Sequence, residues 1–181
     1  MGDVIVKKIL SVLFCFFVIQ NISFAGDKLQ FDFPNAGWHK VASPDGVANK
    51  KCYVPYEQTT EKYNEMLVFQ QKNLKNKDIS PMVILHKQLG KDRLNYSDIV
   101  PEYIVRDFDN AMVTWCSRNH NTCAITRAFN GNNGVVIVQY INKAPHYSQN
   151  MFGQWSNILN KVELYSTSEN NVTDTKRIIE L

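Results

Sequence analysis

The stretch EYIVRDFDNAMVTWCSRNHNTCAITRAFNGNNGVVIVQYIN, residues 102–142, decides the fold that we predict for this chain. Apolar and β-branched residues dominate it, and groups of Asp, Asn and Gly interrupt it in the manner of strands joined by tight turns. The last segment has no polar residue before Gln139, so we expect both of its faces to be covered. The stretch predicts a four-stranded antiparallel meander with strands at Tyr103–Phe108, Ala111–Ser117, Thr122–Phe129 and Val135–Ile141.

Two cysteines flank one turn of this meander. If Asn119 and His120 form a two-residue hairpin turn, Cys116 and Cys123 fall opposite each other on adjacent strands, with Cα atoms about 4.5–5.5 Å apart. That separation lies within the range that disulfides span. We therefore predict a Cys116–Cys123 disulfide and an exposed hairpin tip at Arg118–Asn121.

Cys52 is left over by that pairing, and we favour a buried, inert thiol. A bridge from Cys52 to one of the other cysteines remains the alternative arrangement. A cysteine hydrolase would need a histidine beside an activated thiol, and His39 is the partner of Cys52 that the predicted strands allow. Zinc would need Cys116, His120 and Cys123 together, but a disulfide would use both thiols. No sequence signature supports either site, so we expect no catalytic residue, no metal and no cofactor.

The N-terminus has the three parts of a secretory signal peptide. Lys7 and Lys8 precede the apolar run Ile9–Ile19, and the segment Ser23–Ala25 ends in the small residue that a cleavage site requires. The apolar run is shorter than the roughly 20 residues that span a bilayer. We predict cleavage after Ala25, a periplasmic or secreted protein without stable membrane insertion, and an oxidising environment for its cysteines.

Shorter elements flank the meander. A helix is expected to begin after the N-cap Ser80, with Pro81 in its first turn, and to stop at Gly90. A second, amphipathic helix follows from Ser148 to about Leu164. Upstream, turn residues and a proline delimit three short strands at Gly37–Ala42, Lys50–Val54 and Glu65–Gln70.

This order of elements predicts a single α+β domain, in which helices sandwich an antiparallel sheet of about six to seven strands. The domain covers residues 26–165 and begins with a polar and aromatic lead-in, Gly26–Ala36. We assign residues 1–25 to the signal peptide. Residues 166–181 are polar and aperiodic, and we expect a mobile C-terminal tail there.

Charge and aromatic content indicate the kind of partner. The net charge is +3, and the basic residues are scattered instead of forming a stripe, which argues against nucleic acid. Tyr56 and Tyr147 lie near prolines in expected loops, and tyrosine offers a large contact area at low entropic cost. We predict a recognition surface formed by Tyr56, Glu57 and Gln58 together with Tyr147, on a monomer that binds a protein or a small ligand.

Two segments of the chain resemble a known signature. Tyr53–Thr59, followed by Tyr63–Met66, resembles the Val-Pro-x-Gly-Gln-Thr and Trp-x-Glu-Met signature of exported, uncharacterised bacterial proteins, with Glu57 at the glycine position and Tyr63 at the tryptophan position. Trp115-Cys116, Cys123 and the segment Tyr140–Lys143 resemble the same group.

The order of elements over residues 30–165 is similar to the PsbP-like fold, which also includes the Mog family of Ran-binding proteins. The resemblance implies a PsbP-like (Mog/PsbP) fold and a substrate of type II secretion. It supplies no catalytic residues, and a fold alone does not define a function. We expect an exported, non-enzymatic binding or accessory protein, which as a secreted effector would act on a host protein. The alternative is a secreted hydrolase with an unrecognised active site.

Overall fold

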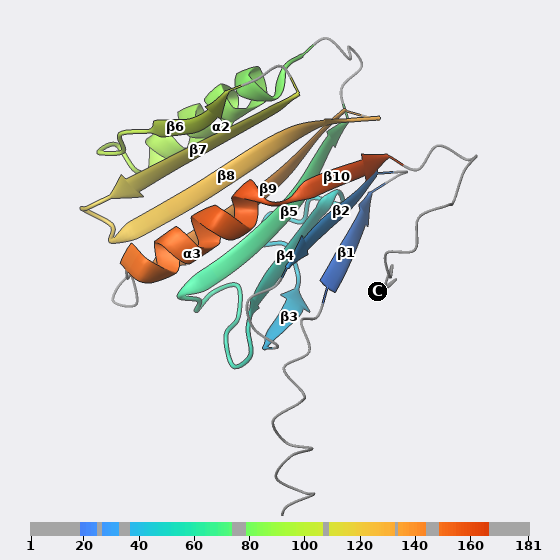
Figure 1. The fold of residues 1–181 in the computed structure, drawn as a ribbon. Coiled ribbons are helices and arrows are strands. Elements are labelled where there is room, and N and C mark those ends of the chain that lie inside the picture. Colours follow the sequence, from blue (N-terminus) through green and yellow to red (C-terminus); the bar gives the residue numbers. More distant parts are fainter. Residues whose placement is uncertain are drawn as a thin grey trace, which may run out of the picture.

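The computed structural model describes residues 19–24, 27–32, 37–73, 79–106, 109–132, 134–143 and 149–166. A seven-stranded antiparallel sheet forms its centre, in the order β3-β4-β5-β9-β8-β7-β6 (Figure 1). The predicted meander occupies β6 to β9, and every predicted strand is present. The bounds are β3 Trp38–Val41, β4 Lys50–Pro55, β5 Glu65–Asn73, β6 Glu102–Arg106, β7 Asn110–Ser117, β8 Thr122–Gly131 and β9 Gly134–Lys143.

Helices cover both faces of this sheet (Figure 1). Helix α2, Pro81–Asn95, packs across β7 and β8 on one face. Helix α3, Gln149–Asn160, lies on the other face, beside a small antiparallel sheet in the order β1-β2-β10. The bounds of its strands are β1 Ile19–Phe24, β2 Asp27–Asp32 and β10 Glu163–Ser166. The fold class is therefore the predicted one, an antiparallel sheet between helices.

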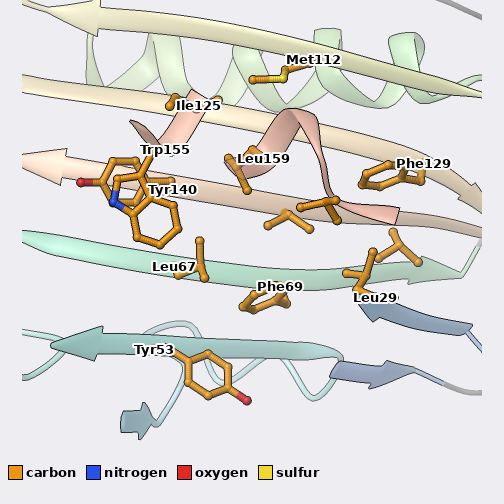
Figure 2. Packing of buried hydrophobic residues seen from close by; sticks show 13 residues of the cluster. Leu29, Tyr53, Leu67, Phe69, Met112, Ile125, Phe129, Tyr140, Trp155 and Leu159 are labelled. Carbon is orange, nitrogen blue, oxygen red and sulfur yellow. The ribbon is translucent and has the colours of Figure 1, made fainter. Parts of the chain in front are cut away.

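The larger hydrophobic core lies between the sheet and α3 (Figure 2). Tyr140 of β9 stacks on Trp155 of α3, with ring centroids 4.4 Å apart and planes at 16°. Under α2 lies a second core, which includes Ile84, Leu85, Leu89, Val113 and Ile137. Because β9 is the central strand, its residues are buried on both faces, as its unbroken apolar run predicted.

The β7–β8 hairpin has the predicted register. Cys116 pairs with Cys123 and the two form the predicted disulfide, while the tip Arg118–Asn121 is exposed. The turn itself differs from the predicted two-residue form. The N–H of Asn121 donates to the carbonyl of Arg118 at 3.3 Å, and the positive φ falls on Asn121, at 48°. Four-residue loops of this kind are most often built around a type I turn.

Helix α2 begins at Pro81 as predicted, but it does not stop at Gly90. It continues to Asn95, where the N–H of Tyr96 donates to the carbonyl of Asp92 at 2.8 Å. Glycine inside a helix costs about 1 kcal/mol relative to alanine. The hydrogen bonds of the helical turn beyond Gly90, which end at Tyr96, offset that cost.

Helix α3 ends at Asn160, not near Leu164, so the predicted boundary is wrong. Arg127 donates from Nη1 to the carbonyl of Leu159 at 2.6 Å, and the chain then leaves the helix to enter β10. Val162 is buried and Leu164 packs against the same core. Their spacing of two residues is the alternation of a strand, which the helical interpretation overlooked.

Strand β2 was not among the predicted strands; it lies in the lead-in Gly26–Ala36, to which we assigned no helix or strand. Its partner β10 is far along the chain, so no local pattern indicates the pairing. Strand β1 falls within residues 1–25, the expected signal peptide, and pairs with the outer edge of β2. Tyr147 and residues 167–181 of the expected tail lie outside the described residues.

Candidate functional site

Several connections meet at one end of the large sheet, which we call the loop end (Figure 1). They are the segment Tyr56–Asn64 between β4 and β5, the hairpin tip Arg118–Asn121, and the segment Tyr96–Pro101 between α2 and β6. Loops on a rigid scaffold are the usual place for binding residues. The loop end is therefore the candidate recognition surface.

Tyr56 of the predicted site is exposed, at 65% of its full surface. Its ring stacks on His39 of β3, with centroids 5.5 Å apart and planes at 13°. Its N–H donates to the carbonyl of Gly37 at 2.6 Å. Tyr56 thus presents a ring to solvent while its backbone and one ring face are held in place.

Glu57 and Gln58 shape the loop. The backbone of Glu57 has φ at 73°, in the left-handed region that favours glycine, and Glu57 stands at the glycine position of the signature. The side-chain Oε1 of Gln58 accepts hydrogen bonds from the N–H groups of Asn64 at 2.8 Å and Glu65 at 3.4 Å. Glu57 is exposed, whereas the Gln58 oxygen is engaged within the loop.

A second aromatic group at the loop end was missed by the sequence analysis. The ammonium of Lys143, at the end of β9, lies 3.6 Å from the ring centroid of Tyr63. Tyr96 packs 5.1 Å from both Trp115 and His120, measured between ring centroids. Burial raises the pKa of Tyr63 and of Tyr96. Their hydroxyls therefore stay neutral at physiological pH and can bind by hydrogen bonding and stacking, not as bases.

The hairpin tip is anchored to the segment that follows α2. The carboxylate of Asp98 accepts hydrogen bonds from Ser117 Oγ at 2.6 Å and from the N–H of Asn119 at 3.0 Å. The Ser117 hydroxyl in turn accepts from the N–H of His120 at 3.2 Å. These bonds hold two connections of the loop end in a fixed relation.

A buried polar network lies behind the loop end, on the α3 face. The hydroxyl of Tyr140 donates to Glu65 Oε2 at 3.1 Å, and Asn142 Nδ2 donates to that hydroxyl at 3.2 Å. Burial is the main reason that the pKa of Tyr140 is raised, and the charge of Glu65 raises it further. The network fixes the first residue of β5 to the end of β9, so it positions the loop without facing solvent.

The residues that carry the resemblance gather in this region although they are dispersed in the sequence. Gln58, Tyr63 and Glu65 come from the β4–β5 side, and neighbouring strands supply the rest. These are Trp115, the Cys116–Cys123 disulfide, Tyr140, Asn142 and Lys143. The side-chain contacts described above tie Gln58 to the start of β5, link Glu65, Tyr140 and Asn142, and pair Lys143 with Tyr63.

Comparison with known proteins gives a likeness of fold. No protein-family model matches the sequence, and no curated protein matches it. The solution structure of cyanobacterial PsbP (CyanoP) from Synechocystis sp. PCC 6803 is similar with a TM-score of 0.55, covering 84% of this chain and 96% of that chain at 9% sequence identity. The chain has the PsbP-like fold. At this identity the likeness concerns the fold alone.

The cysteines of the described residues are either buried or joined to each other. Cys52 is completely buried, and that burial raises the pKa of its thiol. Cys116 and Cys123 are joined to each other. Within the described ranges, no three His, Cys, Asp or Glu side chains are grouped as metal ligands would be. In that same part of the chain, no helix is long and apolar enough to cross a membrane.

Proposed function

We propose that this protein is an exported, non-enzymatic binding or accessory protein that recognises its partner through the loop end. The observation that carries this proposal is Tyr56, a highly exposed ring held against His39 by stacking and fixed by its backbone hydrogen bond. A preorganised aromatic side chain loses little entropy on binding. Tyr63, Tyr96 and Lys143 add polar and aromatic groups at the same end of the sheet.

Export forms the second part of the proposal. Residues 1–25 are removed as a signal peptide, and the mature chain resides in the periplasm or is secreted by a type II system, where it serves as an effector on a host cell. The signal-like N-terminus and the disulfide support an oxidising compartment. Intact mass of the exported form tests the cleavage, since a chain that begins at Gly26 is expected. Retention of residues 1–25 in the membrane fraction would contradict it.

Recognition is tested by quantitative capture of partners with purified exported protein and its Tyr56→Ala variant. We expect Tyr56→Ala to weaken capture of the same partner at least tenfold, because an aromatic hot spot contributes about 1.4 kcal/mol or more. Tyr165→Ala is the matched control, since Tyr165 is also exposed but lies in β10 of the small sheet. Equal capture by all three proteins would refute the assignment of Tyr56.

The non-enzymatic part of the proposal needs a separate measurement. Ester, peptide and glycoside substrates are offered to the exported protein, and no turnover above background is expected. Turnover that a single substitution abolishes would show an enzyme instead. His39→Gln and Cys52→Ser are the variants to examine, because those residues form the pair that the sequence allows for a cysteine hydrolase.

A further inference from the structure

Helix α2 exposes aliphatic side chains on the side that faces away from the sheet. Val83 and Leu94 are about three helical turns apart and so lie on one side of the helix. Leu94 is exposed at 86% of its surface and Val83 at 44%. Leu85 and Leu89 are buried on the opposite side, in the core beneath α2. The helix is therefore apolar on two sides, and one of them is left open to solvent.

Two further exposed aliphatic residues lie next to α2. Val100 is exposed at 80% and follows Ile99, which packs in the core beneath the helix. Ile104 is half-exposed in β6, which lies beside α2 where the ring centroids of Tyr103 and His86 are 5.3 Å apart (Figure 1). Four of the seven large hydrophobic side chains that the described residues expose thus fall in one short part of the chain. Single exposed aliphatic residues are normal, but such a concentration marks an interaction surface.

The exposed charges of α2 are all basic. Lys87 lies between Val83 and Leu94 along the helix, and Lys91 and Arg93 lie on its two flanks. We call this surface the outer face of α2, which consists of Val83, Lys87, Lys91, Arg93 and Leu94.

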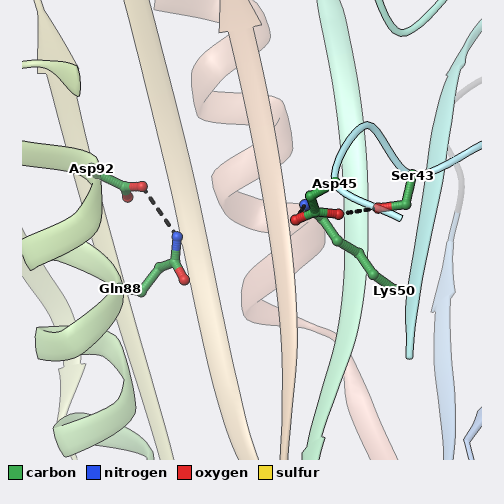
Figure 3. Close-up of polar contacts among 5 residues, drawn as sticks. All are labelled: Ser43, Asp45, Lys50, Gln88 and Asp92. Atoms are coloured by element: carbon green, nitrogen blue, oxygen red, sulfur yellow. Dashed lines mark hydrogen bonds and ion pairs between the residues drawn. The ribbon is translucent and has the colours of Figure 1, made fainter. Parts of the chain in front are cut away.

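Three carboxylates follow in the same part of the chain, and none belongs to the outer face of α2. Asp92 comes two and a half turns after Val83, so it lies on the sheet side, where it accepts a hydrogen bond from Gln88 Nε2 at 3.1 Å (Figure 3). Asp98 accepts hydrogen bonds from the hairpin tip. Glu102 begins β6. The outer face therefore presents three positive charges beside its exposed aliphatic residues.

We propose that the outer face of α2 binds the surface of an anionic phospholipid bilayer. Val83 and Leu94 enter the boundary of the acyl chains, while Lys87, Lys91 and Arg93 contact the headgroups. Helices that lie in the plane of a membrane surface combine aliphatic and basic side chains in this way. Each basic residue close to an anionic bilayer strengthens binding about fivefold.

The composition of the outer face favours a bilayer over other occupants. Protein interfaces are enriched in aromatic residues and depleted of lysine, whereas this face has two lysines and no tyrosine, tryptophan or phenylalanine. A second copy of the chain would bring the basic residues against their own kind, which opposes association. Anionic headgroups supply the complementary charge.

This surface does not rest on the function proposed above. It lies next to β6, at one edge of the large sheet, whereas Tyr56 stacks on His39 of β3 at the opposite edge. Tyr56→Ala should therefore leave vesicle binding unchanged, and loss of vesicle binding should leave partner capture through Tyr56 intact.

Co-sedimentation of the purified exported protein with lipid vesicles tests the proposal. We expect binding to vesicles that contain phosphatidylglycerol, at least tenfold weaker binding to phosphatidylcholine alone, and weaker binding as the salt concentration rises. Leu94→Gln should weaken binding at least threefold. Lys87→Gln combined with Lys91→Gln should weaken it at least tenfold. These positions are exposed, so the variants should fold, and thermal unfolding checks this.

Matched controls change the same residue types elsewhere. Val47→Gln replaces an exposed aliphatic residue between β3 and β4, and Lys62→Gln combined with Lys161→Gln removes two exposed lysines outside α2. Both should bind vesicles as the parent does. A tryptophan introduced by Leu94→Trp should shift its emission to the blue on binding, whereas Val47→Trp should show no shift.

The contrary outcomes are distinct. A parent protein that does not bind phosphatidylglycerol vesicles overturns the proposal, as does equal binding by the parent, Leu94→Gln and the double lysine variant. Sedimentation velocity without vesicles should show a monomer. A dimer that Leu94→Gln dissociates would assign the outer face to a second copy instead, and partner capture that the double lysine variant loses would assign it to an acidic protein.

Discussion

Glu57 has a backbone conformation that the shape of its loop requires. Its φ of 73° is unfavourable for a residue with a side chain, and the signature that the chain resembles has glycine at this position. The neighbouring Gln58 closes the same loop with its side-chain oxygen. Backbone shape is therefore a physical reason for glycine, followed by glutamine, at this step of the signature.

Substitution of Glu57 tests that explanation. Glu57→Gly should stabilise the protein by about 0.5–1 kcal/mol, since glycine adopts positive φ without a steric penalty. Glu57→Ala keeps a Cβ atom and should give no gain. Urea unfolding of the two variants measures the difference. A gain in Glu57→Ala equal to that in Glu57→Gly would mean that loss of the carboxylate, not relief of strain, is responsible.

Tyr140 leads to a prediction about alkaline pH. Its pKa is raised in the folded state by burial and by Glu65, so the folded protein holds the phenolic proton more tightly than the unfolded chain. That stability is fully present below the unfolded value of about 10 and is lost as the pH rises above it. Tyr140→Phe should lower stability near pH 7 by about 1–2 kcal/mol, because Asn142 loses its acceptor.

The same variant should lose stability less steeply above pH 10 than the parent protein. Tyr56→Phe is the control, since it removes an exposed hydroxyl. Urea unfolding across pH 7 to about 11 measures both effects. Identical pH slopes for Tyr140→Phe and the parent would show that Tyr140 does not carry this linkage.

At the scale of elements, glycines in the helices offer a direct test of helix energetics. Gly90 lies inside α2, is exposed, and an added Cβ would meet no atom within 4 Å. Gly90→Ala should therefore stabilise the protein by about 0.5–1 kcal/mol. Gly46 also has free space but has φ at 65°, so Gly46→Ala should destabilise. Thermal unfolding of the two variants measures both effects. Stabilisation by both substitutions would contradict the role that we give to backbone conformation.

Elements stabilised by near neighbours were predictable from the sequence, whereas those stabilised by distant ones were not. The meander follows from alternation and turn residues, and the Cys116–Cys123 pair follows from its register. Strand β2 depends on pairing with β10, and β10 appears after a helix whose apolar stripe continues into Val162 and Leu164. Short strands take their stability from tertiary context, so local propensity does not indicate them.

The candidate site also contains features that the sequence predicts and features that it does not. Tyr56 could be predicted because its own surroundings, a proline and an expected loop, indicate exposure. The contact between Lys143 and Tyr63 joins residues that are remote in sequence. No spacing in the chain encodes such contacts, because they arise only when the sheet has been assembled.

At the scale of the whole molecule, the small sheet indicates what cleavage after Ala25 should do. Among the described residues, strand β1 pairs with the outer edge of β2, whereas the large sheet and helices α2 and α3 lie beyond residue 25. Protein comprising residues 26–181 should therefore fold cooperatively, with a Tm within about 5 °C of that of the full chain. Calorimetry of the two forms measures this. Unfolding of the shorter form at 25 °C would make residues 19–24 part of the essential fold.

The edge position of β1 bears on how the chain avoids aggregation. Exposed edge strands can pair with other molecules, and charged residues on the edge prevent this. Residues 19–24, IQNISF, contain no charge, whereas β2, DKLQFD, contains Asp27, Lys28 and Asp32. Proposed cleavage would replace an uncharged edge by a charged one. The uncleaved chain would then be the form most in need of a chaperone, and cleavage would itself protect the shorter protein against aggregation.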